Sequence, residues 1–196
     1  MISMAESNKT NSDKLVAQCC IAGGGPAGMM LGFLLARAGV DVVVLEKHTD
    51  FLRDFRGDTI HPSTLEIMHE LGLLDEFLKL PHEKVYELNV QIGDTRLTLA
   101  DFTRLPTRCG FIAFMPQWDF LDFLADHGHR YPTFHLLMQA EVTEIIKEAE
   151  HVTGLRAQTP AGSLEVRADL VVAADGRYSI VREKADLPVQ EIGAPM

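Results

Sequence analysis

The sequence contains few cysteines, and none of them lie in a C-x-x-C arrangement. Its 196 residues include only Cys19, Cys20 and Cys109. Neighbouring residues in a strand point to opposite faces of a sheet, so Cys19 and Cys20 are poorly placed to pair with each other. We therefore expect reduced thiols and a cytoplasmic protein.

Basic residues and long apolar runs are also scarce. Eighteen Lys and Arg residues stand against 28 Asp and Glu, a formal charge of −10, so the sequence lacks the basic surface that nucleic acid requires. The longest apolar stretches, Ile21 to Ala27 and Met29 to Ala36, are too short for a membrane span. Residues 1–14 are polar and lack the apolar core of a signal peptide, and we expect them to form a disordered tail.

The remaining residues have the composition of one folded domain. Hydrophobic residues make up 46% of the chain, which is enough for a core. Leu15 to Ala22 is an apolar run typical of a strand, Pro26 to Ala38 has helical apolar spacing, and Asp41 to Leu45 is a β-branched run typical of a buried strand. Because these segments follow one another closely, they predict a βαβ unit and an α/β fold.

A glycine-rich turn joins the first predicted strand to its helix. The segment Gly23 to Gly28 reads G-x-G-x-x-G, and this strand–turn–helix context distinguishes a dinucleotide-binding turn from a chance match. Gly23 permits the sharp turn, Gly25 lets the backbone approach a pyrophosphate, and Gly28 lets the helix pack close to the strand. The helix N-terminus then faces the phosphates.

An acidic residue lies where such a turn requires one. Glu46 ends the second strand eighteen residues after Gly28, where its carboxylate can accept hydrogen bonds from an adenosine ribose and repel a 2′-phosphate. NAD and FAD share the adenosine ribose and the pyrophosphate, so these residues do not choose between them.

Downstream, the pattern alternates between helices and short strands. We predict helices over Pro62 to Leu71 and Asp119 to Asp126, and a hairpin formed by Val85 to Ile92 and Thr95 to Ala100. Further strands are predicted at residues 135–138, 142–147, 152–158, 164–166 and 170–174. The hairpin is antiparallel structure inserted into an α/β chain.

A second motif resembles one particular family. The segment from Leu170 to Gly176 places Asp175 and Gly176 at the end of a buried strand, ahead of Ser179 and Arg182. Ligands bind at such strand ends in open α/β sheets. With the glycine turn, this motif resembles the aromatic-ring hydroxylases related to para-hydroxybenzoate hydroxylase, which bind FAD. The resemblance covers roughly residues 15–188.

The resemblance implies further cofactor contacts. Arg56 matches the family's arginine near the flavin pyrophosphate, Gln117 matches its flavin-contacting glutamine, and Val142 lies where relatives offer backbone groups to the adenine. The complete set of expected FAD-binding residues is Gly23, Gly25, Pro26, Ala27, Gly28, Glu46, Lys47, Arg56, Gln117, Val142, Asp175 and Gly176. No catalytic residue is assigned.

The resemblance also predicts how the chain is divided. We expect a Rossmann-like FAD-binding domain over residues 15–84 and 116–196, with residues 85–115 contributing a hairpin and a strand to an incomplete substrate domain. The family's later Gly-Asp motif does not follow Asp175, so we expect the chain to be the amino-terminal part of such an enzyme. Its activity in isolation is therefore an open question.

The function implied by the resemblance is a monooxygenase that takes electrons from NADH or NADPH and hydroxylates a small aromatic molecule. Two alternatives remain: an FAD-dependent reductase or epoxidase of the same fold, and a non-catalytic nucleotide-binding fragment. A flavin disulfide reductase is disfavoured by the missing cysteine pair. A simple NAD dehydrogenase explains neither the hairpin nor Asp175.

The histidines predict no metal site. His127, His129 and His135 lie near one another in sequence, but an H-x-H spacing by itself is a weak metal-ligand pattern. His61 precedes Pro62 at a predicted helix start, where a local loop contact is the simplest interpretation.

Overall fold

The computed structural model describes residues 13–52, 58–190 and 192–193. These residues form two compact units, one drawn from residues 1–50 and 124–196 and the other from residues 51–123. Residues 1–12 of the predicted tail and Arg56 lie outside the described residues.

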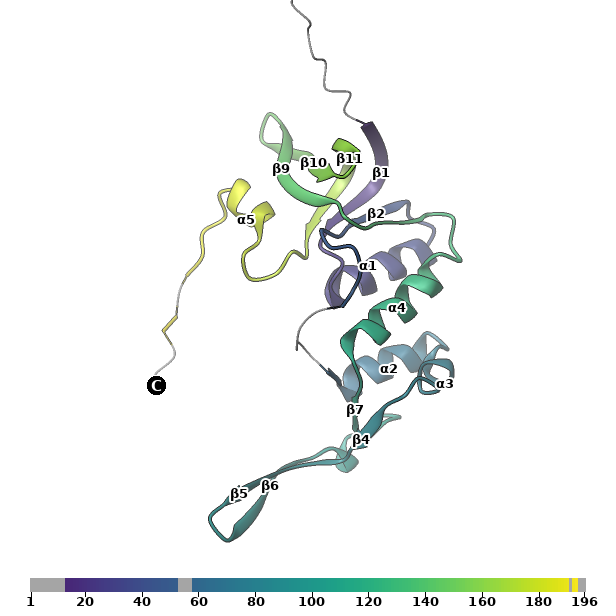
Figure 1. The fold of residues 1–196 in the computed structure, drawn as a ribbon, viewed down its shortest axis with the longest axis vertical. Coiled ribbons are helices and arrows are strands. Elements are labelled where there is room, and N and C mark those ends of the chain that lie inside the picture. Colours follow the sequence, from purple (N-terminus) through teal and green to yellow (C-terminus); the bar gives the residue numbers. More distant parts are fainter. Residues whose placement is uncertain (1–12, 53–57, 191, 194–196) are drawn as a thin grey trace, which may run out of the picture. The chain divides into compact units, whose positions relative to one another are not determined.

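The first unit is built on a six-stranded sheet with the order β8-β2-β1-β11-β10-β9 (Figure 1). Strands β8, β2, β1 and β11 run parallel to one another. Strands β10 and β9 continue the sheet beyond β11 in antiparallel fashion. In chain order the strands are β1 (Asp13–Ala22), β2 (Val42–Leu45), β8 (Phe134–Leu137), β9 (Glu141–Glu148), β10 (His151–Thr159) and β11 (Gly162–Ala173).

Helix α1 (Pro26–Arg37) lies against β1, β2 and β8. Its buried Met29 and Phe33 face the sheet, while a Cβ on Gly32 would come within 2.7 Å of Val44 Cγ2. The helix ends before Gly39, whose φ of +82° is favourable for glycine and difficult for other residues. The predicted βαβ unit is confirmed, and β1 begins two residues earlier than predicted.

An apolar core fills the first unit between the sheet and helix α5 (Ile180–Lys184). Cys20 and Leu45 come from β1 and β2, Leu155 and Val166 from β10 and β11, and Val181 from α5. Both halves of the sheet therefore share one core, which explains why the strands have β-branched and aliphatic sequences.

Strand β11 differs from the prediction. Residues 164–166 and 170–174 were expected to form two strands, but one continuous strand runs from Gly162 to Ala173. It pairs with β10 as far as Arg167, and it pairs with β1 on both sides of Asp169, from Leu164 to Ala168 and from Leu170 to Ala173. Polar Arg167 and Asp169 looked like an interruption, yet pairing on the β1 side carries the strand past them.

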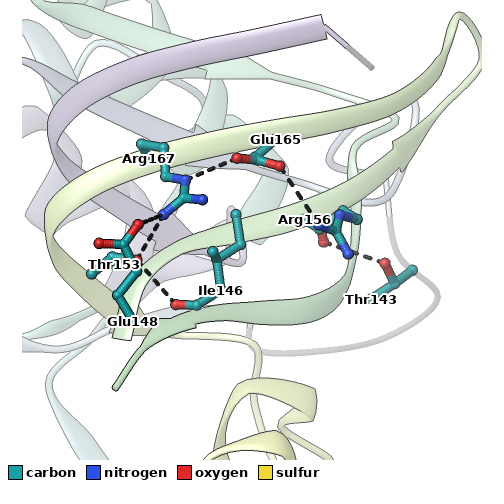
Figure 2. Close-up of polar contacts among 7 residues, drawn as sticks. All are labelled: Thr143, Ile146, Glu148, Thr153, Arg156, Glu165 and Arg167. Atoms are coloured by element: carbon teal, nitrogen blue, oxygen red, sulfur yellow. Dashed lines mark hydrogen bonds and ion pairs between the residues drawn. The ribbon is translucent and has the colours of Figure 1, made fainter. Parts of the chain in front are cut away.

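A network of charged side chains ties β9, β10 and β11 together (Figure 2). The Arg167 guanidinium donates hydrogen bonds to Glu165 Oε1 at 2.8 Å, to Glu148 and to Thr153 Oγ1. Arg156 Nη2 lies 3.6 Å from Glu165 Oε2. Glu165 is buried between these two arginines, which satisfies its charge and explains how a carboxylate is tolerated there.

The second unit contains two helices, α2 (Pro62–Glu70) and α3 (Leu74–Phe77), and a small sheet with the order β3-β7-β4. Its strands are β3 (Thr59–Ile60), β4 (Glu83–Val85) and β7 (Ile112–Phe114). Helix α4 (Gln117–Gly128) begins in this unit, where the ring of Phe77 packs edge-on against Phe120 and Phe123. Sequence patterns had predicted α2, α4 and one strand besides the hairpin within residues 85–115, where β7 lies, but not α3, β3 or β4.

A separate hairpin in this unit joins β5 (Glu87–Ile92) to β6 (Thr95–Asp101), and a short 3₁₀ helix, η1 (Phe102–Arg104), follows. One side of the hairpin is apolar and exposed: Leu88, Ile92, Leu97 and Leu99 keep 40–69% of their surface accessible. The predicted α/β class with an antiparallel hairpin is confirmed.

The charged network gives a prediction about acid stability. Hydrogen bonding from Arg167 is the main cause that lowers the pKa of Glu165 below its ordinary value of 4.5. Because the folded-state pKa is depressed, the stabilisation is present above about pH 4.5 and is lost as the pH falls through the lowered pKa. We expect Glu165→Gln to reduce the melting temperature at pH 7 and to flatten its dependence on pH below 4.5. Equal shifts at pH 7 and pH 3 would contradict this account.

Candidate nucleotide-binding site

The carboxyl ends of three neighbouring strands are aligned at one edge of the sheet. Ala22 of β1 is paired with Leu45 of β2 on one side and with Ala173 of β11 on the other. The chain beyond each strand stays in register, because Gly23 N donates to Leu45 O and Ala174 N donates to Ala22 O, both at 2.8 Å. Residues that follow these strands therefore lie side by side.

The glycine turn after β1 is packed too closely for side chains at two positions. Gly23 has a φ of +101°, and a Cβ there would come within 2.7 Å of the carbonyl carbon of Ala174. A Cβ on Gly28 would overlap the carbonyl oxygen of Gly23. These two glycines therefore allow α1 to begin directly against the end of β1, as the spacing predicted.

Gly25 lies in a different environment. An added Cβ would meet no atom within 4 Å, and its φ of −72° is accessible to any residue. It is the N-cap of α1, with Pro26 at the first helical position and Met29 N donating to its carbonyl oxygen at 2.9 Å. The first turn of a helix leaves N–H groups without intrahelical partners, and here these belong to Ala27 and Gly28. The open side of Gly25 is thus a cradle that a ligand phosphate can reach.

Glu46 follows β2 beside this turn. Its carboxylate is buried and accepts two backbone hydrogen bonds, from Gly24 N to Oε2 at 2.8 Å and from His48 N to Oε1 at 3.0 Å. The His48 imidazole Nε2 lies 3.9 Å from Oε1. A carboxylate beside the glycine turn is the acceptor that ribose hydroxyls require. The sequence had identified Glu46 but not the contributions of Gly24 and His48; the neighbouring Lys47 is exposed.

The connection from β8 to β9 lies beside Glu46 and His48. Ala140 N donates to Glu46 O at 2.8 Å, and Gln139 N donates to His48 O at 2.9 Å. Val142 follows two residues later in β9, half-buried and packed against the core of the first unit. Val142 therefore lies close in the chain to the segment that borders Glu46.

Asp175 follows β11 on the other side of the glycine turn. Its Oδ2 accepts a hydrogen bond from Val181 N at 3.3 Å, while its Oδ1 is shielded from solvent and has no partner among the described residues. Gly176 has a φ of +83°, which favours glycine at this bend. A buried carboxylate oxygen without a donor is unfavourable, so this position suits a ligand that supplies one.

The remaining predicted residues lie elsewhere. Gln117 begins α4 in the second unit and is half-buried. Of the histidines, His127 is buried, His129 packs against Phe134, and His135 Nε2 lies 2.9 Å from Asp41 Oδ1. Within the described residues, no three His, Cys, Asp or Glu side chains are grouped so that they could hold a metal ion.

Together, the glycine turn, the helix N-terminus and the two acidic residues define a dinucleotide-binding α/β protein. A sequence model of the FAD binding domain matches residues 16–194, and the chain belongs to that family. The family supplies the choice between NAD and FAD that the turn alone left open, and FAD is confirmed as the cofactor.

Relatives with known functions are monooxygenases. The chain is 32% identical over 173 residues to a 6-methylpretetramide 4-monooxygenase of Streptomyces rimosus, covering 88% of this chain and 41% of the relative. It is 32% identical over 186 residues to a 3-(3-hydroxy-phenyl)propionate/3-hydroxycinnamic acid hydroxylase of Klebsiella pneumoniae, covering 91% and 32%. The predicted resemblance to aromatic hydroxylases is confirmed.

Solved structures of a monooxygenase and a hydroxylase are also similar to this chain. The p-nitrophenol 4-monooxygenase PnpA of Pseudomonas putida superposes with a TM-score of 0.79 at 27% identity, covering 92% of this chain and 46% of that one. The anhydrotetracycline hydroxylase OxyS of Streptomyces rimosus gives 0.74 at 28% identity, covering 86% and 33%. The chain thus spans a third to a half of the length of these relatives. Across the described part of the chain, no helix is long and apolar enough to cross a membrane.

The contrast between Gly25 and Gly28 yields a prediction with an internal control. Gly25→Val places its side chain in open space, so we expect a loss of stability of about 1 kcal/mol from the poorer helix cap and the abolition of FAD binding. Gly28→Val forces a side chain into the Gly23 carbonyl and should cost about 3 kcal/mol or more.

Thermal melts and FAD titrations of both variants provide the check. Gly25→Val should melt close to the wild type and bind no FAD, whereas Gly28→Val should melt well below it. Unchanged FAD affinity in a folded Gly25→Val protein would rule out the phosphate cradle at this turn.

Proposed function

We propose that this chain is the FAD-holding part of a flavin-dependent monooxygenase that uses NADH or NADPH and oxygen to hydroxylate a small aromatic molecule. The observation that carries the proposal is the alignment of Glu46, the glycine turn and Asp175 at the ends of three adjacent strands. When bound, FAD would supply the redox and oxygen chemistry, while the protein positions the substrate and excludes water.

The order of the strands favours one orientation of the cofactor. Neighbouring strands lie about 4.8 Å apart, so β2 and β11 are separated by roughly 10 Å with β1 between them. A dinucleotide with its adenosine ribose on Glu46 would place its pyrophosphate over the glycine turn. Its flavin half would then extend toward β11 and Asp175.

Charge and dipole support this orientation. The N-terminus of α1 attracts the anionic pyrophosphate through its free N–H groups and partial positive charge. Hydrogen bonds from Gly24 and His48 fix the Glu46 carboxylate beside the turn, so it can meet the ribose without reorganising. A 2′-phosphate next to this buried carboxylate would be repelled, which favours a free ribose diol.

The proposed FAD site includes all the residues expected from the sequence. Gly23, Gly25, Pro26, Ala27 and Gly28 would contact the pyrophosphate; Glu46, Lys47 and Val142 the adenosine; and Asp175 and Gly176 the flavin half. Arg56 and Gln117 are assigned through the family resemblance, to the pyrophosphate and the flavin respectively.

We propose the same domain division as the sequence predicted. The FAD-binding domain would comprise residues 15–84 and 116–196, and residues 85–115 would belong to a substrate domain. The exposed apolar side of the β5–β6 hairpin supports this division, because a sheet face of that kind is stable when covered by further structure. A cytoplasmic location is also proposed, in keeping with three free cysteines.

The substrate class is supported by the names of the relatives, which give 6-methylpretetramide, 3-(3-hydroxy-phenyl)propionate and p-nitrophenol as substrates. An FAD-dependent reductase or epoxidase of the same fold is the alternative. Titration of the purified chain with FAD, followed by NADH- or NADPH-dependent oxygen uptake with a panel of phenols, tests the proposal. FAD binding with phenol-dependent hydroxylation supports the proposal. FAD binding without any hydroxylation would show that this chain by itself binds the cofactor but does not hydroxylate these phenols.

Glu46 provides a quantitative prediction. We expect Glu46→Ala to weaken FAD binding by about 1–3 kcal/mol, because the ribose loses a charged acceptor. The apoprotein should also become less stable, because Gly24 N and His48 N both lose their acceptor.

Isothermal titration at a temperature where both proteins are fully folded separates the two effects. Glu150→Ala, at an exposed turn between β9 and β10, is the matched control and should change neither quantity. An unchanged FAD affinity in Glu46→Ala would show that Glu46 does not bind the ribose.

A further inference from the structure

The loop between β11 and α5 contains Ser179 of the second motif and is held by several hydrogen bonds. Ser179 is buried and serves as the N-cap of α5, its Oγ accepting a hydrogen bond from Arg182 N at 3.0 Å. Arg182 Nη2 donates to Arg177 O at 3.0 Å, which closes the loop from the other side. These two hydrogen bonds connect the loop to the start of α5.

This loop determines where the Asp175 side chain lies. The only donor that the structure gives this carboxylate within the described residues is Val181 N, at 3.3 Å from Oδ2. Val181 is the second residue of α5, and its side chain is buried in the core of the first unit. The position of the Val181 N–H, and with it that of Asp175, thus depends on where α5 begins.

Ser179 determines that starting point. A helix begins where a cap satisfies its first N–H groups, and replacing a serine cap by alanine typically costs about 1 kcal/mol. Because α5 has only five residues, few other interactions compensate for a lost cap. Fraying of this first turn would withdraw the Val181 N–H from Asp175 while leaving β1, β2 and Glu46 in place.

We propose that Ser179 is a positioning residue for FAD, acting through Asp175 on the flavin half of the cofactor. The inference rests on the proposed function, since it assumes that Asp175 faces that half. It assigns to Ser179 a role separate from the adenosine contacts at Glu46. Ser179 should therefore influence FAD, which has a flavin half, more than ADP, which has none.

The test compares the affinities of FAD and ADP in the wild type, Ser179→Ala and Ser179→Thr. We expect Ser179→Ala to weaken FAD binding roughly fivefold while ADP binding changes by less than about twofold. Ser179→Thr keeps a capping hydroxyl and should restore the wild-type ratio. A merely structural effect would weaken both ligands alike.

Two further variants make the test decisive. Asp101→Ala removes a cap of the same kind in the second unit, where Asp101 Oδ1 accepts from Thr103 N, and it should leave the FAD-to-ADP ratio unchanged. In an Asp175→Asn background, Ser179→Ala should have no further effect on the ratio.

The possible failures are distinguishable. If the wild type binds neither FAD nor ADP, the proposed function fails and this proposal fails with it. If the wild type binds both and Ser179→Ala leaves their ratio unchanged, or if the effect persists with Asn at 175, only the role of Ser179 is overturned.

Discussion

The site depends on the close approach of α1 to the end of β1. The turn between them leaves no room for a Cβ at Gly23 or Gly28, because the carbonyl groups of Ala174 and Gly23 occupy that space. Since Ala174 is itself hydrogen-bonded to Ala22, the turn, α1 and β11 meet at a single point. A larger residue there would separate the helix N-terminus from the strand ends and dismantle the edge on which every other contact is built.

The acidic residues on either side of this turn are held differently. Glu46 is fixed by two short backbone hydrogen bonds. Asp175 has one longer hydrogen bond and one oxygen without a partner among the described residues. We infer that the adenosine side of the site is preorganised by the sheet, whereas the other side depends on the loop before α5 and on the ligand. Preorganisation reduces the free energy spent on ordering when a ligand binds.

The sequence predicted the first βαβ unit well because its signals are local. Glycine spacing, a β-branched run and an acidic strand end each reflect a requirement of the nearby backbone, and the structure places Gly23, Gly28 and Glu46 accordingly. The continuity of β11 was missed because pairing with β1 overrides its polar residues. Contacts of Gly24 and His48 with Glu46 were also missed, because they are backbone interactions that carry no side-chain signature. Helix α3 and strands β3 and β4 are too short to show a periodic pattern.

A crystal structure of this chain soaked or grown with FAD tests the central claim most directly. The account predicts the pyrophosphate at the open side of Gly25, within hydrogen-bond distance of the Ala27 and Gly28 N–H groups. It also predicts the adenosine ribose on Glu46 and the flavin half on the Asp175 side. A cofactor bound away from the glycine turn, or bound with its adenosine beside Asp175, would contradict the account.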